Sequence, residues 1–239
     1  VVFSAFSYKD WEGTFYPGEL PRRRWLEYYS GVFPTVELNV TFYRLPRVET
    51  FTKWYSETPS DFSFGLKGSR LITHLKKIKD VEGLVEEFFA RASGLKEKLS
   101  VILWQFPPSD KFDKDRFKRF LDHLDKYPAW NAFEFRNDTW INDDVVQMCR
   151  SHGAALCMAD WPSFIADLPV TADFIYIRRH GVQGNYMSSY SREALEKDAR
   201  KIRAYLDEGL DVFVYFNNDA RGYAPNNAKE LMELVFGGT

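Results

Sequence analysis

Hydrophobic and polar positions recur along this chain with two different periods. In "TVELN" (35–39) they alternate, which is typical of a strand with one buried face. Other short segments either alternate in the same way or are continuously apolar, and these are 1–7, 62–69, 99–107, 132–136, 154–160, 174–181 and 211–219. The pattern therefore predicts strands at eight places along the chain.

Amphipathic segments with the longer period lie between these strands. Residues 81–97 and 113–127 place apolar side chains at steps of three and four, which predicts a helix with one buried face in each. Residues 191–208 repeat the pattern and stop at Gly209, a favourable residue just beyond a helix. Residues 161–173 are short and interrupted by proline, so this crossover is expected to have a degenerate helix.

Strands that alternate with helices favour a parallel sheet closed as a (β/α)8 TIM barrel. The chain has 239 residues, close to the typical barrel length of about 250. An open doubly wound sheet is the alternative, but it normally has a glycine-rich phosphate turn after its first strand, and "SYKDWEG" is not one. We expect residues 1–239 to form a single TIM-barrel domain.

The composition limits the kinds of binding partner and the cellular compartment that we expect for this chain. The net charge of −2 gives no global positive field to recruit nucleic acid, so any anion site must be a local cluster. Cys149 and Cys157 cannot make a disulfide framework, which favours a reducing cytoplasm. No apolar run approaches the roughly 20 residues needed to cross a bilayer, so no membrane association is expected.

Polar residues concentrate at the ends of the predicted strands. In a TIM barrel, alternate side chains point inward and the carboxyl ends of the strands carry the active site. If Val36 and Leu38 face the helices, Glu37 and Asn39 point inward. The same alternation points Lys67, Ser69, Glu134, Arg136, Tyr176, Arg178 and His180 inward, while Gln105, Asp160, Asn217 and Asp219 lie at or near the ends of their strands.

Three members of this set are candidate catalytic residues. Glu37 and Glu134 could act as a general acid and base, or they could neutralise Lys67 and Arg136 in a structural ion network. Lys67 could form a Schiff base, although an ion-pairing or phosphate-binding lysine is the simpler interpretation.

A metal site is a further alternative. His180 and Asp160, with Glu37 and Glu134, could bind a divalent ion. The chain has 4 His, and two of them fall in helical segments, which disfavours a multi-histidine zinc site. A carboxylate-rich Mg²⁺ or Mn²⁺ site stays open, and no residue is assigned as a metal ligand.

Cationic and aromatic side chains suggest what the site would bind. Arg70, Arg136 and Arg178 with Lys67 form a local cationic set, which suits phosphate or carboxylate recognition. Tyr43 and Trp140 lie on loops that follow the strands. Their rings could stack on a base or sugar, or could close the top of the barrel by packing.

The segment "YFNNDARGYAPNNA" predicts a strand end, a tight turn and the start of a helix near Pro225. Asn217 and Asn218 end the strand, and Gly222 permits the turn. A helix N-terminus after a late barrel strand is a common phosphate site, because free N–H groups and the helix dipole attract anions. Ordinary capping of that helix by Asn is the alternative.

Several ordered motifs resemble a known family. "GLKGSRLITH", "WQFPPS", "FEFRNDTW" and "YFNNDARGYAPNNA" are similar to segments of the YecE-like family, a family of unknown function with a TIM-barrel fold. The resemblance covers nearly the whole chain. It implies the fold and names no reaction.

We therefore expect an enzyme that acts on an anionic, phosphate-bearing, hydroxylated substrate by hydrolase, lyase or isomerase chemistry. The anion would be held by Arg136, Lys67 and Arg178, and substrate hydroxyls would be oriented by Asn39, Gln105 and Asn217. Glu37 or Glu134 would move protons. A non-catalytic nucleic-acid or ligand-binding module and a divalent-metal-dependent phosphodiesterase are the alternatives.

Overall fold

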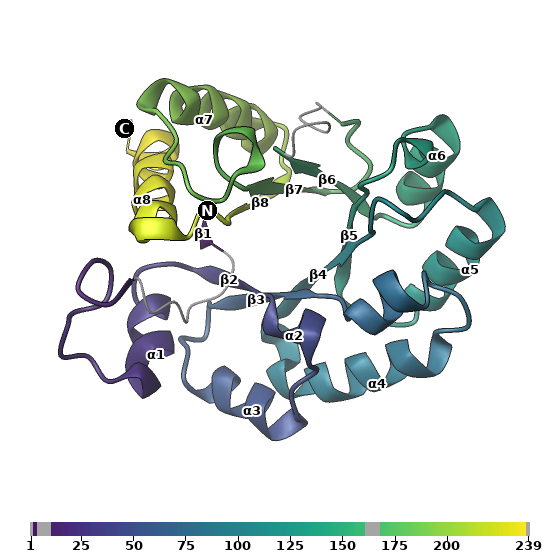
Figure 1. Ribbon diagram of the computed structural model, residues 1–239, viewed down its shortest axis with the longest axis horizontal. Helices are drawn as coiled ribbons and strands as arrows, with labels where there is room; N and C mark the ends of the chain where they lie inside the picture. The colour runs from purple at the N-terminus through teal and green to yellow at the C-terminus, as the bar shows by residue number, and fades with distance from the viewer. Residues whose placement is uncertain (1, 4–10, 161–167, 238–239) are drawn as a thin grey trace. The chain divides into compact units, whose positions relative to one another are not determined.

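The computed structural model describes residues 2–3, 11–160 and 168–237 (Figure 1). The strands are β1 (Val2–Phe3), β2 (Thr35–Leu38), β3 (Ser63–Lys67), β4 (Leu99–Gln105), β5 (Trp130–Glu134), β6 (Ala155–Ala159), β7 (Phe174–Arg179) and β8 (Asp211–Phe216). The α-helices are α1 (Trp25–Ser30), α2 (Val40–Tyr43), α3 (Val48–Ser56), α4 (Glu82–Ala92), α5 (Lys114–Leu124), α6 (Asp143–Ser151), α7 (Arg192–Asp207) and α8 (Tyr223–Phe236).

Short turns of other helical types connect these elements. A five-residue π turn, η3 (Leu71–Leu75), follows β3. The 3-10 turns are η2 (Arg22–Arg24), η4 (Ser93–Lys98), η5 (Asp138–Trp140), η6 (Val182–Gly184) and η7 (Ala220–Gly222).

The chain forms two compact units. The first unit consists of Val1–Glu37, Met158–Asp167 and Asp173–Thr239, and the second consists of Leu38–Cys157 and Leu168–Ala172. Each unit contains parallel strands and the helices that pack against them.

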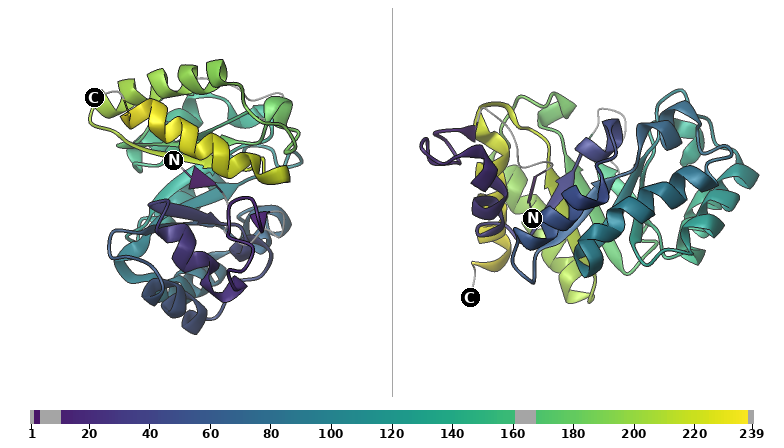
Figure 2. Two further views of the ribbon diagram at one scale, coloured as in Figure 1. Left: turned by 90° about the vertical axis from the view of Figure 1, so that its left-hand side faces the viewer. Right: turned by 90° about the horizontal axis from the view of Figure 1, so that it is seen from below.

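In the first unit, β8 lies between β1 and β7, and both pairings are parallel. Helix α8 contacts β1 and β8, while α7 packs against α8 and β8. Figures 1 and 2 show α7 and α8 side by side along this group of strands. Of the apolar positions that form the predicted face of α7, Leu195, Ala199 and Ile202 are buried, whereas Leu206 is exposed.

In the second unit, β3, β4, β5 and β6 form consecutive parallel pairs. Trp104 and the neighbouring Phe88 and Phe120 illustrate its core, since one strand and two helices contribute to a single buried aromatic group. Figure 1 shows α3 to α6 following one another along the outside of these strands.

Local sequence explains where several helices start and stop. Asp113 caps α5, because its Oδ1 accepts a hydrogen bond from the Arg116 amide at 2.9 Å. Ser191 caps α7 in the same way through the Ala194 amide. Gly209 follows the end of α7 at φ 81°, a conformation that favours glycine.

The fold class is the α/β TIM barrel that the sequence predicts: strands and helices alternate, and the strand pairings within each unit are parallel. Most of the crossover predicted to be degenerate, 161–167, lies outside the described residues. Its remainder, 168–173, contains no helix. That residues 1–239 form a single domain stays a prediction.

Two local expectations differ from the structure. The residues after β2 do not continue as a loop but turn at once into the four-residue helix α2. Helix α8 starts at Tyr223 rather than near Pro225, because Gly222 at φ 73° directs the chain into the helix earlier. Pro225 then lies within the first turn, where its missing N–H has no helical acceptor to lose.

Candidate functional site

Three neighbouring strand ends in the second unit carry predicted site residues. Lys67 ends β3 and is in register with Leu103 of β4. Gln105 ends β4 and is in register with Glu134, the last residue of β5. Parallel pairing therefore brings Lys67, Gln105 and Glu134 to the same end of three adjacent strands.

Glu134 and Arg136 form an ion pair, as one of the two sequence interpretations expected. The Arg136 Nε donates to Glu134 Oε1 at 2.8 Å, and its Nη2 lies 2.8 Å from the same oxygen. Glu134 is buried, whereas 13% of the Arg136 side chain is exposed. The carboxylate is thus buried, while the Arg136 side chain is partly exposed.

Lys67 is positioned by contacts from α2. The Lys67 Nζ lies 4.4 Å from the centroid of the Phe42 ring, a cation–π geometry. The Thr41 hydroxyl lies 2.6 Å from the Lys67 carbonyl oxygen and 2.9 Å from that of Leu38, so it ties α2 to the end of β3.

Gly68 is required by the packing beside Lys67. A Cβ at this position would lie 2.3 Å from Cε3 of Trp104. The Gly68 amide also donates to the Leu103 carbonyl at 2.8 Å. The indole of Trp104 can pack against the backbone of Gly68 only because glycine has no side chain.

His74 lies next to this group, and the sequence analysis did not select it. It belongs to η3, and its ring meets Phe42 edge to face at a centroid distance of 4.9 Å. Its Nδ1 is 2.9 Å from the Thr73 hydroxyl oxygen. The available signal was the spacing of Lys67, Arg70 and His74 at steps of three and four in "GLKGSRLITH".

Burial, followed by the positive charges of Lys67, Arg70 and Arg136, lowers the pKa of His74 to about 4 against the opposing effect of Glu134. The imidazole is therefore neutral at pH 7. Because three cations act on one half-buried ring, this end of the second unit has a positive local potential.

Lys67, Arg70, His74, Glu134 and Arg136 are called the cationic cluster below. The remaining predicted residues of this unit surround it less directly. Asn39 follows β2, and its buried Oδ1 makes no hydrogen bond to any residue in the described ranges. Gln105 is buried, and Tyr43 on α2 is 77% exposed.

Trp140 corrects one sequence prediction. It was placed among the substrate-binding residues, with packing at the top of the barrel as the alternative, and its exposure of only 1% favours packing. Its ring stacks on Phe135 at 4.4 Å, and its Nε1 donates to the Asp110 carbonyl at 2.8 Å. Trp140 is therefore a core residue of the second unit.

The first unit contains a different network around Glu37. The Tyr176 hydroxyl donates to Glu37 Oε2 at 2.5 Å, and Arg178 Nη2 donates to Glu37 Oε1 at 2.8 Å. The same Nη2 also lies 3.2 Å from Oδ1 of Asn217. Both carboxylate oxygens thus have donors, and Glu37 is 0% exposed.

Burial raises the pKa of Tyr176 well above its ordinary value, and the neighbouring Glu37 charge raises it further. Tyr176 therefore remains a neutral hydrogen-bond donor to the carboxylate. We refer to Glu37, Tyr176, Arg178 and Asn217 as the Glu37 network.

Asp160 and His180 lie together in the first unit. Asp160 Oδ1 accepts from the His180 amide at 2.6 Å and lies 3.3 Å from His180 Nδ1. Asp160 Oδ2 accepts from the Tyr190 hydroxyl, which in turn accepts from the Gly181 amide at 2.7 Å. The carboxylate thus organises the start of the segment that follows β7.

Asn218 corrects a second prediction. It was expected to contact a ligand, but it is fully buried, and its Nδ2 donates to the Ser188 carbonyl at 2.9 Å and to Asn227 Oδ1 at 3.0 Å. It joins the segment after β7 to α8. Neither Asn217 nor Asn218 caps α8, since the residue before this helix is Gly222 and no side chain caps it.

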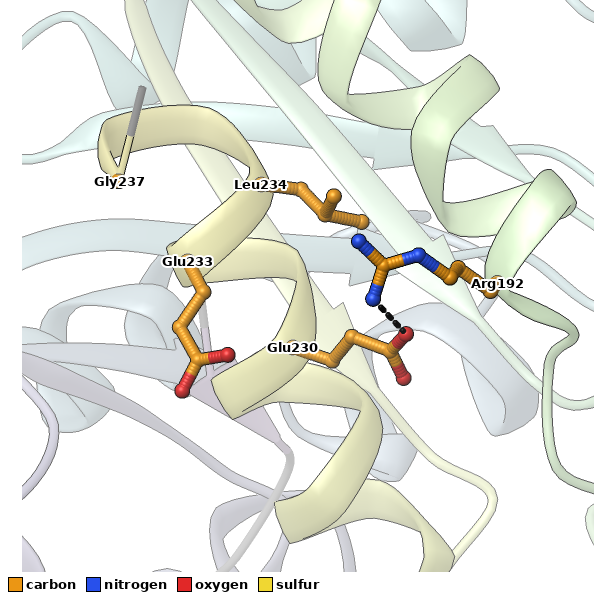
Figure 3. A pocket seen from close by; sticks show the side chains of 5 residues that line it. All are labelled: Arg192, Glu230, Glu233, Leu234 and Gly237. Atoms are coloured by element: carbon orange, nitrogen blue, oxygen red, sulfur yellow. Dashed lines mark ion pairs between the residues drawn. The ribbon is translucent and has the colours of Figure 1, made fainter. Parts of the chain in front are cut away.

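A shallow hollow on the surface of the first unit contains none of the predicted residues. It has a volume of about 240 Å³ and lies between the start of α7 and the end of α8 (Figure 3). There Arg192 points toward Glu230, with 3.5 Å between Nη1 and Oε1, and Glu233 projects from the same helix as Glu230.

No three His, Cys, Asp or Glu side chains within the described ranges gather closely enough to hold a metal ion. The predicted set of His180, Asp160, Glu37 and Glu134 is therefore not assembled as a metal site there. Among the same residues, no helix combines the length and apolar character needed to span a membrane.

Comparison with known proteins identifies the family. The model of the family described as "Protein of unknown function DUF72" matches residues 1–237. The chain belongs to the DUF72 family. This agrees with the YecE-like resemblance seen in its motifs, because similar proteins include the UPF0759 proteins YunF and YecE.

The similar proteins match different shares of this DUF72 chain. YunF of Bacillus subtilis is 27% identical over 256 residues, which span 93% of this chain and 90% of YunF. YecE of Escherichia coli K12 is 35% identical over 104 residues, or 44% of this chain and 38% of YecE.

Two solved DUF72 structures have the same fold. One from Thermotoga maritima MSB8 is 30% identical with a TM-score of 0.78, and the match covers 98% of this chain and 97% of that one. One from Enterococcus faecalis V583 is 20% identical with a TM-score of 0.81, covering 98% and 94%. This DUF72 chain therefore shares its fold with these relatives. The residues of the Glu37 network lie in the first unit, and those of the cationic cluster lie in the second.

Proposed function

We propose that this protein is an enzyme that binds a small anionic, phosphate-bearing, hydroxylated substrate at the cationic cluster and acts on it by acid/base chemistry. The observation that carries the proposal is that Lys67 and His74 contact the same Phe42 ring, at the strand ends where Arg136 pairs with Glu134. The charges of Lys67, Arg70 and Arg136 also contribute to the lowered pKa of His74. The whole chain has a net charge of −2, so this positive potential is local.

The members of the cluster suit the recognition of an oxyanion. Arg136, whose Nε and Nη2 hold Glu134, is partly exposed, and Arg70 is exposed. Guanidinium and ammonium groups bind phosphate through charge-assisted hydrogen bonds, which are about twice as strong as neutral ones. The carboxyl ends of barrel strands are also where TIM-barrel enzymes bind their substrates.

Glu134 and Lys67 are the proposed proton-transferring groups. Both end strands of the same parallel sheet, and Gln105 on the strand between them can orient a substrate hydroxyl. A carboxylate and an amine at this spacing support hydrolysis, elimination or isomerisation next to a bound phosphate. Glu37 is left out of this role, because both of its carboxylate oxygens already accept hydrogen bonds in a fully buried network.

One observation favours a second candidate, a module that binds single-stranded nucleic acid without catalysis. Tyr43 exposes 77% of its surface on α2, the helix that also places Phe42 against Lys67. An exposed aromatic ring beside cations can stack a base while the cations hold the backbone.

Isothermal titration calorimetry with sugar phosphates, nucleotides and their dephosphorylated forms tests the proposal. We expect phosphate esters to bind at least about tenfold more tightly than the parent alcohols, because a hydrogen bond to a charged group contributes about 1.5–3 kcal/mol. Lys67→Gln should remove most of this difference. The exposed Lys53→Gln, also in the second unit, is the matched control and should leave binding unchanged.

Equal affinity for esters and parent alcohols would contradict the proposal, as would unchanged binding by Lys67→Gln. Conversion of a bound ester, followed by phosphorus NMR, supports the enzyme. Tight oligonucleotide binding that falls steeply with salt, without turnover of any ester, supports the binding module instead.

A further inference from the structure

The local contacts of His74 in the cationic cluster do not account for both of its ring nitrogens. Its ring is half-buried against the Phe42 edge, and Lys67 Nζ approaches the same Phe42 ring at 4.4 Å. The π turn η3 therefore carries an imidazole into the group of side chains proposed to bind the anion. Turns of this kind occur frequently at functional sites.

The two ring nitrogens of His74 have different surroundings. Nδ1 is 2.9 Å from the Thr73 hydroxyl, and that hydroxyl also lies 3.3 Å from the Ser69 carbonyl oxygen. Nε2 makes no hydrogen bond to any residue that the structure describes. Nδ1 is thus occupied by its chain neighbour, and Nε2 is the atom that can meet a ligand.

The charges that face the ring come from the elements around it. Lys67 ends β3, Arg70 precedes η3, and Arg136 and Glu134 lie at the end of β5. Three positive charges against one negative charge disfavour a proton on His74. A bound oxyanion would offset this excess of positive charge, and so it would remove the main electrostatic obstacle to protonation.

We propose that His74 is a binding residue of the anion site whose protonation is coupled to occupancy. It is neutral when the site is empty, and its Nε2 takes up a proton from solvent as the anion binds and donates that proton in a hydrogen bond to an anion oxygen. The inference rests on the proposed function, because it requires that the cationic cluster bind an anion.

Coupling of this kind is reciprocal. If the anion favours the protonated ring, the protonated ring must favour the anion by the same factor. The pKa of about 4 in the empty site would rise on binding, and a rise of about two units is in the range produced by a close opposite charge. Anion binding would then be about tenfold tighter at pH 5 than at pH 8.

Sulfate is the suitable probe, because it keeps its charge over this range while phosphate titrates near neutrality. Proton NMR of the histidine ring signals would be recorded from pH 8 to pH 5, with sulfate or with chloride at equal ionic strength. His74→Gln assigns the His74 signal by its loss. We expect that signal to stay constant in chloride and to move toward the protonated position below about pH 6 in sulfate.

Calorimetry of sulfate binding supplies the second readout. The wild-type affinity should increase as the pH falls, whereas His74→Gln, which keeps an amide donor near the Nε2 position, should bind at pH 8 and lose the increase. Arg70→Gln should raise the pKa of His74 in the empty protein, because one of the opposing cations is removed. Arg119→Gln, an exposed arginine on α5, is the matched control and should not change it.

The two proposals fail in different ways. If sulfate binds and the His74 signal stays unmoved, or if His74→Gln keeps the full pH dependence, the role of His74 is wrong and the anion site stands. If neither sulfate nor a phosphate ester binds at any pH from 8 to 5, both proposals are overturned.

Discussion

The Glu37 network and the cationic cluster come from the same sequence pattern, but their charged groups differ in pairing and in exposure. Each has a glutamate and an arginine at strand ends. In the first unit, Glu37 accepts hydrogen bonds on both oxygens from groups that are themselves buried. In the second unit, cations outnumber the carboxylate, and Arg70, Arg136 and His74 reach solvent. We infer from the difference that the Glu37 network stabilises the fold, and we propose the cationic cluster as the ligand site.

The physical basis of the contrast is desolvation. A buried carboxylate with matched donors holds its geometry, and little is gained by a further ligand. Where partly exposed positive charges are in excess, they repel one another, and a bound anion reduces this repulsion. The comparison therefore predicts that loss of a charge lowers stability in the first unit and weakens anion binding in the second.

The largest effect is expected from Glu37→Leu in the first unit. It leaves the guanidinium of Arg178 buried and without its carboxylate, and removal of one partner of a buried pair costs about 3–5 kcal/mol of the free energy of unfolding. Urea unfolding followed by circular dichroism measures the loss. Glu27→Leu, which removes an exposed carboxylate from the same unit, is the control and should change stability little. Similar stabilities for the two variants would contradict a structural role for the network.

Gly68→Ala should give the next largest effect. The new methyl group would overlap the Trp104 ring at 2.3 Å, and overpacking of this kind costs about 1–3 kcal/mol. The displaced strand end should also weaken anion binding, because Lys67 precedes this residue. Gly83→Ala on α4 meets nothing within 4 Å and is the matched control. If Gly68→Ala is as stable as Gly83→Ala and binds anions normally, the packing account of this strand end is wrong.

Lys67→Gln should weaken anion binding with little change in the free energy of unfolding. We expect the free energy of unfolding to change by less than about 1 kcal/mol, because Lys67 is only half-buried and lies among like charges. Phosphate-ester binding should fall at least about tenfold in calorimetry. A large loss of stability with unchanged binding would place Lys67 in a structural network like that of Glu37.

The smallest expected effect concerns acid stability. The pKa of His74 is about 4 in the folded state and ordinarily 6.5, so the unfolded chain binds more protons between these values. Its neutral ring therefore contributes stability above pH 6.5 that is lost as the pH falls toward 4. His74→Gln should lose less stability than the wild type over this window in urea unfolding, with His152→Gln as the matched substitution. A steeper loss in His74→Gln would contradict this assignment.

The sequence was informative where periodicity and spacing determine position. The order of strands and helices predicted the parallel α/β fold. The two-residue separation of Glu134 and Arg136 predicted that they share a face, and an ion pair with Arg136 was one of two alternatives for Glu134. The predicted helix starts at residues 113 and 191 lie within one residue of the observed starts of α5 and α7.

It was not informative where a turn redirects the chain. His74 was missed because it lies beyond the end of β3, in a π turn where the alternation of the strand no longer applies. Trp140 was misplaced because Asn137 accepts from the Thr139 amide and folds η5 back, which returns the indole onto Phe135. Asn218 is buried by Ser188 and Asn227, partners distant in the sequence that no local pattern reveals.

Hydrogen exchange resolved by peptide, with and without a saturating phosphate ester, tests most directly the claim that anions bind the cationic cluster and not the Glu37 network. We predict slower exchange within residues 67–75 and 134–140 and a smaller effect in Lys67→Gln at the same ligand concentration. Protection that appears in residues 174–180 and 215–218 while 67–75 exchange unchanged would contradict the account.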